Sequence, residues 1–475
     1  MVKISSAAPM RWFSLAVSAL LLYSTMTRIG TGGECSAYRM AAFSCDVTPP
    51  IGHSLSASLG VSAVTSIADP LMAYGWILYG EGEPVVLVSV DWCGIGNEAH
   101  DGWRTQIAEA ARTTRDRVLV CTIHQHDAPL VDWSAEQLLA GVDQPGKVVD
   151  LSWHESVLER VSEVVGSAAD RSVEISHVGV GESEVERIAS NRRIFGTDGR
   201  VVRFRGSASQ DPALQEAPEG LVDPKLKLIS FWNQEQPIAS LAVYATHPMS
   251  FYGKGEVSSD FVGLARRWME NEVSRGVHFY ANGCGGNLAA GKYNDGSQAS
   301  RIELAERLHR AWVSAWKSTR KTPLEIARFH SANMNLLPRE EIGFRQSDFE
   351  RLLRNEDAAL SERVRAAFGL SWLNRCTDLQ HGLDLPMIDF GVAKLLLLPG
   401  EPFVEYQLFA QQAAPDSMVF TLGYGDYGPC YIPYDKAYEE GGYEPGAWSF
   451  VGPGVERRVQ AAIDDVLSDE RKPLR

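Results

Sequence analysis

The fold of this chain is constrained most by an alternation of short apolar runs with amphipathic helical patterns between residue 43 and about residue 280. Residues 84–92 (PVVLVSVDW) form a strand-like run, residues 103–115 have the periodicity of a helix, and a second strand-like run follows at residues 117–124. Apolar runs bounded by turn signals favour strands, and apolar residues spaced three and four apart favour helices. The pattern predicts a mixed α/β fold, in which mixed sheets are flanked by helices.

Several of the apolar runs end in a residue type that binds metals or catalyses reactions. RVLVCTIHQH ends with His124 and His126, ASLAVYATHP contains His247, and AKLLLLPGE ends at Glu401. The loop just past a packed strand gives a side chain both rigid placement and access to solvent. Two histidines and a carboxylate from distant segments suit a divalent metal, zinc first, with one position open for water. The combination predicts a metal-dependent enzyme.

Each of these residues also has a simpler explanation when taken alone. A single histidine such as His124 or His247 is more often a hydrogen-bonded residue of the core than a metal ligand. Glu401 follows an apolar run directly, and a carboxylate there also suits the start of a helix. No C-x-x-C pair occurs, so a catalytic metal site fits the sequence better than a structural zinc site.

The composition limits the class of protein and its partners. A chain of 475 residues with 45% hydrophobic content can bury a large core. Its formal net charge is −15, with acidic residues spread along the chain. This charge argues against nucleic acid and against a strong electrostatic membrane partner, because both are anionic. Neutral or cationic small-molecule substrates are compatible with it.

The seven cysteines are too widely spaced to define a disulfide framework. Cys35 and Cys45 are near enough in sequence to pair. Cys93, Cys121 and Cys284 lie in or beside apolar runs, where cysteine usually acts as a small buried hydrophobe. A nucleophilic Cys284 is the alternative, although no basic residue adjoins it in the sequence NGCGGN.

The N-terminus carries the features of an export signal. Lys3 and Arg11 precede an apolar run at residues 12–23 (WFSLAVSALLLY), and polar residues follow it. This order resembles a secretory signal peptide, and the run is short for a membrane span. We predict that residues 1–40 form a leader and that the protein is exported, either to the periplasm or the medium or anchored through this segment. A mis-assigned start codon remains an alternative.

Three later segments have distinct patterns. Residues 206–224 are rich in Ser, Pro and acidic residues and predict a surface loop. Residues 301–317 and 347–368 predict two amphipathic, charged helices of an outer layer. Residues 427–448 are dense in Gly, Pro and Tyr without periodicity, which predicts a long ordered loop, and such loops are usually functional.

Short motifs in a fixed order run from residue 43 to about residue 450. They are FSCDVTPPIG, DPLMAYGWIL, VVLVSVDW, TIHQHDAP, YATHPMSF, SSDFVG, NGCGGNL, LLPGE and YIPYDKAYEEGGYE. Together they resemble the catalytic domain of the neutral ceramidases, which are zinc-dependent amidohydrolases that cleave the N-acyl bond of ceramide. The resemblance implies one catalytic domain over residues 41–475, one zinc ion per chain and a lipid or other small-molecule substrate.

The resemblance also implies roles for individual residues. The implied zinc ligands are His124, His247, Glu401 and Tyr431. His126, two residues past His124 in an extended segment, would lie close to the metal without binding it and act as the general base. Tyr443 would donate a hydrogen bond to the oxyanion of the tetrahedral intermediate. Arg192, in ASNRRIF, matches the family's active-site arginine, with the adjacent Arg193 as the alternative register.

The chain departs from the family in two respects. Ala289 stands where the family carries an active-site serine after G-N-L, and we expect no counterpart of the family's immunoglobulin-like C-terminal domain. We therefore predict a zinc-dependent amidohydrolase that cleaves ceramide-like N-acyl lipids with a metal-activated water. Two alternatives stay open, namely a zinc hydrolase of the same fold for another small amide or ester, and an inactive binding protein of this fold.

Overall fold

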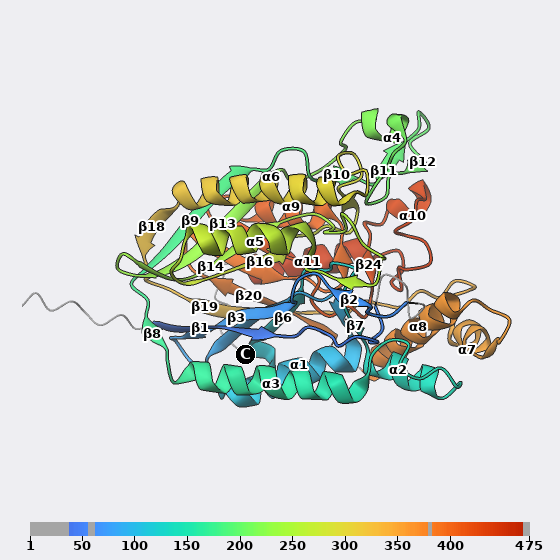
Figure 1. The fold of residues 1–475 in the computed structure, drawn as a ribbon, viewed down its shortest axis with the longest axis horizontal. Helices are drawn as coiled ribbons and strands as arrows, with labels where there is room; N and C mark the ends of the chain where they lie inside the picture. Colours follow the sequence, from blue (N-terminus) through green and yellow to red (C-terminus); the bar gives the residue numbers. More distant parts are fainter. Residues whose placement is uncertain (1–37, 56–61, 379–381, 469–475) are drawn as a thin grey trace, which may run out of the picture. The chain divides into compact units, whose positions relative to one another are not determined.

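Three larger sheets, five two-stranded sheets and the helices around them make up the computed structural model, which describes residues 38–55, 62–378 and 382–468 (Figure 1). The described residues belong to one compact unit that starts at Ser36. The expected leader and Cys35 lie outside the described residues. Among the helices of the described ranges, none combines the length and the apolar character needed to cross a membrane.

The first sheet combines antiparallel strands with one parallel pair. Its strands, in sheet order, are β6 (Val118–Thr122), β4 (Val85–Val90), β3 (Met72–Tyr79), β1 (Arg39–Asp46) and β8 (Val173–Glu174). Helix α1 (Asn97–Ala111) connects the parallel strands β4 and β6. Helix α3 (Leu151–Ala169) begins at Asp150, whose carboxylate accepts hydrogen bonds from two backbone N–H groups.

The second and third sheets also combine antiparallel strands with one parallel pair. The second has the order β16 (Val277–Asn282), β14 (Gln236–Tyr244), β13 (Lys225–Asn233), β9 (His177–Glu184) and β18 (Arg320–Pro323). The third has the order β19 (Arg328–Met334), β20 (Leu383–Asp389), β21 (Ala393–Leu397) and β23 (Met418–Leu422). Helix α5 (Asp260–Glu272) connects the parallel strands β14 and β16, and α9 (Val404–Ala413) connects the parallel strands β21 and β23.

The core lies in three apolar clusters between layers. Trp76 of the first sheet contacts Phe231 and Phe279 of the second edge-on, at ring distances of 5.1 and 5.2 Å. Side chains of the third sheet belong to the same cluster. Helices α1 and α3 cover the other face of the first sheet, and α5 and α6 (Gln298–Lys317) cover that of the second (Figure 1). The layers are therefore helix, sheet, sheet and helix, and the predicted mixed α/β fold is confirmed.

The remaining elements are short or lie at the periphery. The strands are β2 (Ser66–Ile67), β5 (Gly94–Ile95), β7 (Leu130–Val131), β10 (Ser190–Asn191), β11 (Arg193–Phe195), β12 (Val201–Phe204), β15 (Glu256–Val257), β17 (Leu288–Ala289), β22 (Glu401–Pro402) and β24 (Tyr431–Ile432). The helices are α2 (Trp133–Ala140), the 3-10 helix η2 (Arg115–Arg117), α4 (Pro212–Glu216), α7 (Gln346–Arg354), α8 (Leu360–Asp378), α10 (Ala437–Glu440) and α11 (Val455–Leu467).

The single helix predicted for residues 347–368 is wrong, because the structure has two helices, α7 and α8, with a turn between them. The Asn355 side chain accepts a hydrogen bond from the Asp357 backbone N–H at 3.1 Å, and the Asn355 carbonyl accepts one from Ala358. Such a local side-chain bond competes with helical hydrogen bonding. The predicted surface loop at residues 206–224 contains the short helix α4.

Candidate metal centre

The candidate ligands follow the strands that form parallel pairs. His124 lies two residues past β6, His247 lies three residues past β14, and Glu401 begins β22, four residues past β21. Each of these side chains is buried. Strand β22 pairs in parallel with β24, and this register sets Glu401 beside Tyr431. The carboxyl ends of parallel strands are a usual place for ligand sites, since the loops that leave them converge there.

The three side chains meet at one carboxylate oxygen. Glu401 Oε2 lies 2.9 Å from His247 Nε2 and 3.3 Å from His124 Nε2. The ligand atoms of the three residues all lie within 4.8 Å of one another. The phenol of Tyr431 is linked to this group by Arg192, whose Nη1 lies 3.0 Å from the Tyr431 hydroxyl and 3.4 Å from His247 Nε2. The structure thus brings together all four residues that the sequence singled out.

Backbone carbonyls fix the orientation of both imidazoles. His124 Nδ1 lies 2.7 Å from the Cys93 carbonyl oxygen, and His247 Nδ1 lies 2.7 Å from the Gly285 carbonyl oxygen. A carbonyl only accepts hydrogen bonds, so each Nδ1 carries a hydrogen, and each Nε2 faces Glu401 Oε2. Metal-binding histidines usually have this arrangement.

Two tyrosines that the sequence did not single out support the centre. The Tyr427 hydroxyl donates to Glu401 Oε1 at 2.7 Å, which leaves Oε2 facing the imidazoles. The Tyr424 ring stacks on His124 at a ring distance of 4.6 Å. Burial opposes ionisation of Glu401, yet His124 and His247 hold the pKa of its carboxyl well below the usual value. The centre therefore contains a buried carboxylate that the two imidazoles keep ionised.

Two glycines of the motif NGCGGNL pack so closely against neighbouring backbone that no side chain would fit. A Cβ at Gly285 would lie 2.5 Å from the Thr246 carbonyl oxygen, and one at Gly286 would lie 2.3 Å from that of Glu401. Both distances are far below van der Waals contact, so glycine is required at these two positions. This close approach lets the Gly285 carbonyl accept the hydrogen bond from His247.

The neighbouring Cys284 is fully buried. Burial raises the pKa of its thiol well above the ordinary value, which fits a buried hydrophobe and not a nucleophile.

His126 lies beside the three-residue group and outside it. Its Nε2 lies 3.3 Å from His124 Nε2. The backbone of His124 is left-handed, with φ of +58°, and differs here from the regular extended segment expected from the sequence. Burial, together with the imidazoles of His124 and His247, lowers the pKa of His126 well below the ordinary value. The neutral form of the ring is therefore favoured.

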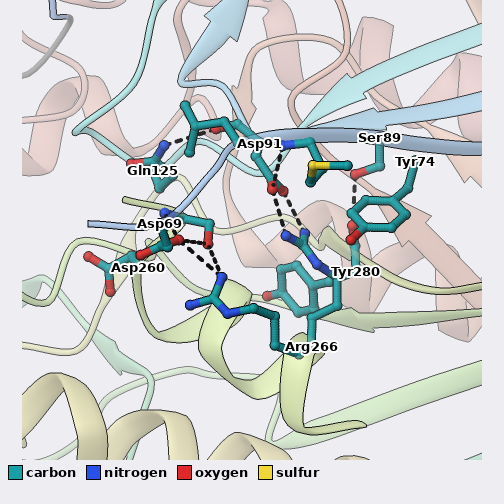
Figure 2. A network of polar contacts seen from close by, with 12 residues as sticks. Asp69, Tyr74, Ser89, Asp91, Gln125, Asp260, Arg266 and Tyr280 are labelled. Atoms are coloured by element: carbon teal, nitrogen blue, oxygen red, sulfur yellow. Dashed lines mark hydrogen bonds and ion pairs between the residues drawn. The ribbon is translucent and has the colours of Figure 1, made fainter. Parts of the chain in front are cut away.

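A buried polar network holds the segment that carries both histidines (Figure 2). Gln125 donates to the Asp91 carbonyl oxygen at 2.9 Å, and Asn282 donates to the Ile123 carbonyl oxygen at 2.6 Å. The Asp91 carboxylate, directly after β4, forms two bonds of 2.6 Å with the guanidinium of Arg266 on α5. The first sheet is thus tied to the second sheet and its helix next to the site.

The two adjacent arginines point in different directions. Arg192 reaches the centre through the contacts described above, whereas Arg193 pairs with Glu440 at 3.1 Å and with Glu444 at 3.4 Å. Arg192 is therefore the one of the two arginines that contacts the centre. The Tyr443 ring lies 5.9 Å from the Tyr431 ring and is 44% exposed, so it stands at the rim of the centre.

No protein-family model matches this chain, and no curated protein sequence matches it. Solved structures do resemble it. A ceramidase complexed with C2 has a TM-score of 0.68 and 17% sequence identity, over 91% of this chain and 75% of that chain. The neutral ceramidase from Pseudomonas aeruginosa has a TM-score of 0.67 and 18% identity, over 91% of this chain and 74% of that chain. At these identities the likeness shows the fold, and at that level the resemblance predicted from the motifs is confirmed.

Proposed function

We propose that this chain is a zinc-dependent amidohydrolase that cleaves the N-acyl amide bond of ceramide-like lipids. The observation that supports this proposal most strongly is the convergence of two imidazole Nε2 atoms on one buried oxygen of Glu401. The shared fold with ceramidases and the nearby Tyr431 hydroxyl add support. Two imidazoles and a carboxylate are ordinary zinc ligands, and a phenolate is an unusual fourth one.

The residues that would hold the ion are His124, His247, Glu401 and Tyr431. They fit a zinc ion because each imidazole already donates its Nδ1 hydrogen to a carbonyl, which directs its Nε2 at the carboxylate of Glu401. When bound, zinc supplies a Lewis acid that polarises the amide carbonyl and lowers the pKa of a water to about 7. Phenolate is favoured over phenol beside a dication.

The chain's own residues carry the proton transfers. His126, neutral and next to His124, accepts the proton of the attacking water when its oxygen bonds to the amide carbon. The same imidazole passes this proton to the nitrogen when the C–N bond breaks, which gives a carboxylic acid and an amine, and the acid then loses its remaining proton to the amine or to solvent. Tyr443 and the guanidinium of Arg192 stabilise the negative charge that develops on the carbonyl oxygen.

Exposed apolar side chains beside the centre support a lipid substrate. Phe204 lies 4.8 Å from the Arg192 guanidinium carbon and 5.1 Å from the Tyr443 ring. Phe195 and Val202 belong to the same β11–β12 hairpin and are also exposed. An exposed apolar group at the rim of a polar centre suits a binding site for hydrocarbon, and the Phe204 ring stands in such a place for the chain of an N-acyl lipid.

A second candidate keeps the metal and changes the substrate. Ala289 lies buried on β17 opposite Ser190, whose hydroxyl donates to the Ala289 carbonyl oxygen at 2.9 Å. This chain therefore lacks the serine hydroxyl that the family carries at position 289. A hydrolase of another small amide or ester is compatible with that absence.

Elemental analysis and a substrate panel test the proposal. We expect about one zinc per chain in the wild type, strong loss of zinc in His247→Ala, and no loss in His330→Ala, which changes an exposed histidine on β19. Ceramide and short N-acyl amides or esters should then be assayed side by side. Unchanged zinc in His247→Ala would remove this residue from the ligand set, and turnover of esters without any amide turnover would favour the second candidate.

A further inference from the structure

Glu444 is a fully buried carboxylate that follows Tyr443 at the rim of the centre. Its Oε1 lies 3.5 Å from Nε of Arg192, and its Oε2 lies 3.4 Å from Nη1 of Arg193. One carboxylate therefore lies between two buried guanidinium groups from consecutive residues. Both arginines are buried, so solvent does not screen the repulsion between their charges.

Beyond Glu444, basic and acidic side chains alternate in a row that leads away from the centre. Nη2 of Arg193 lies 3.1 Å from Glu440 Oε2, and Glu440 also takes a hydrogen bond from Tyr434 and pairs with Lys436 at 2.9 Å. Glu440 thus resembles Glu444 in chemistry and in its contact with Arg193. The two carboxylates differ in one respect, because Glu444 also contacts Arg192.

The guanidinium of Arg192 contacts different groups through its Nη1 and its Nε atoms. Nη1 donates to the Tyr431 hydroxyl at 3.0 Å, and Nε faces Glu444. The rings of Phe204, Tyr443 and Tyr431 lie 4.8, 5.3 and 5.7 Å from the guanidinium carbon. These rings restrict the plane of the group. A carboxylate at Nε sets which way the group points within that plane.

We propose that Glu444 is a positioning residue, which holds the Arg192 guanidinium on the Tyr431 hydroxyl. Without its charge, Arg192 and Arg193 would repel each other in a buried environment where a single uncompensated charge is strongly disfavoured. Arg192 would then shift away from Tyr431. The expected effect of Glu444 on turnover rests on the proposed function. The expected effect of Glu444 on the position of Arg192 does not.

Glu444→Gln tests the proposal against Glu440→Gln as the matched control. Both substitutions remove one carboxylate from Arg193, so both should lower the melting temperature. Only Glu444→Gln should move the Arg192 guanidinium away from the Tyr431 hydroxyl in a crystal structure. On a soluble short-chain N-acyl amide, Glu444→Gln should lower kcat by about 10- to 100-fold at unchanged zinc content, since misplacement by about 1 Å costs up to about 100-fold. Glu440→Gln should stay within about twofold of wild type.

Glu444→Asp keeps the charge and withdraws it by one methylene, which makes it the variant to use if the glutamine variant does not fold. We expect it to lower kcat about 3- to 10-fold with zinc retained. The proposal is overturned if Arg192 stays in place in Glu444→Gln, or if both glutamine variants lower kcat equally. Absence of amide turnover in the wild type would instead contradict the proposed function, and the position of Arg192 in the two crystal structures would still decide the role of Glu444.

Discussion

Replacing Arg266 by methionine should destabilise the fold more than any other single arginine change on α5. The guanidinium of Arg266 makes two bonds of 2.6 Å to Asp91, and both residues are about 1% exposed. In Arg266→Met the Asp91 carboxylate would keep one hydrogen bond, from the Met72 backbone N–H at 3.0 Å, and no counter-charge. A buried ion left without its partner costs about 3–5 kcal/mol.

The cost converts into a measurable change in melting temperature. An unfolding entropy of about 0.9 kcal/mol/K, appropriate for a chain of this length, gives a fall in Tm of about 3–6 °C. Asp91→Asn combined with Arg266→Met removes both charges and leaves an amide that can still accept from Met72. Because no ion is then left unpaired, the double variant should melt above the single variant Arg266→Met.

Arg267→Met is the control on the same helix. Arg267 pairs with Asp69 at 3.1 Å, but its side chain is 32% exposed, so the pair contributes at most about 1 kcal/mol. Thermal unfolding followed by the fluorescence of the buried tryptophans measures all four proteins. If Arg266→Met melts within about 1 °C of Arg267→Met, or if the double variant melts below Arg266→Met, the account of this ion pair is refuted.

Three further predictions concern catalysis and pH. His126→Ala should keep its zinc and lose turnover by about 10²- to 10⁴-fold, as elemental analysis and kinetics would show, and loss of zinc would make His126 a ligand. Ala289→Ser should raise kcat for ceramide at least about tenfold at equal zinc occupancy, because it restores a donor near the developing charge, and no gain would indicate a site built for another substrate. Burial lowers the pKa of His154 to about 3, and both ring nitrogens face indole N–H groups, of Trp103 at 2.9 Å and Trp133 at 3.1 Å. The His154 imidazole therefore binds a proton more readily in the unfolded chain than in the folded one. The free energy of unfolding should fall by about 1.4 kcal/mol per pH unit as the pH drops from about 6.5 towards 3. In urea titrations, His154→Gln should reduce this dependence on pH.

The grouping of His124, His247 and Glu401 could be predicted because each of these residues stands just past an apolar run, where the local pattern marks the end of a strand. His124, His247 and Glu401 required only that pattern and the chemistry of their side chains. The hydrogen-bond partners of these residues could not be predicted in the same way. The carbonyl groups of Cys93 and Gly285 have no side-chain signal, and their positions depend on how separate sheets pack.

Two further features needed the structure for physical reasons. Arg192 and Arg193 are identical in chemistry and adjacent in sequence, so only the buried position of Glu444 and the Tyr431 hydroxyl distinguishes them. The break between α7 and α8 depends on a side-chain bond of Asn355 that competes with an otherwise continuous helical periodicity. Sequence periodicity is insensitive to such a local bond.

The assembly of the centre from three sheets also determines when it can form during folding. His247 and Glu401 are 154 residues apart, and neither lies in the same sheet as the strand before His124. Contacts between segments this distant form late, because closing such long loops is slow. A metal ion would therefore meet a complete set of ligands only after the sheets have docked. Bound there, it would slow unfolding far more than it would speed folding, and removing it with a chelator would shorten the lifetime of the native state while leaving the refolding rate nearly unchanged.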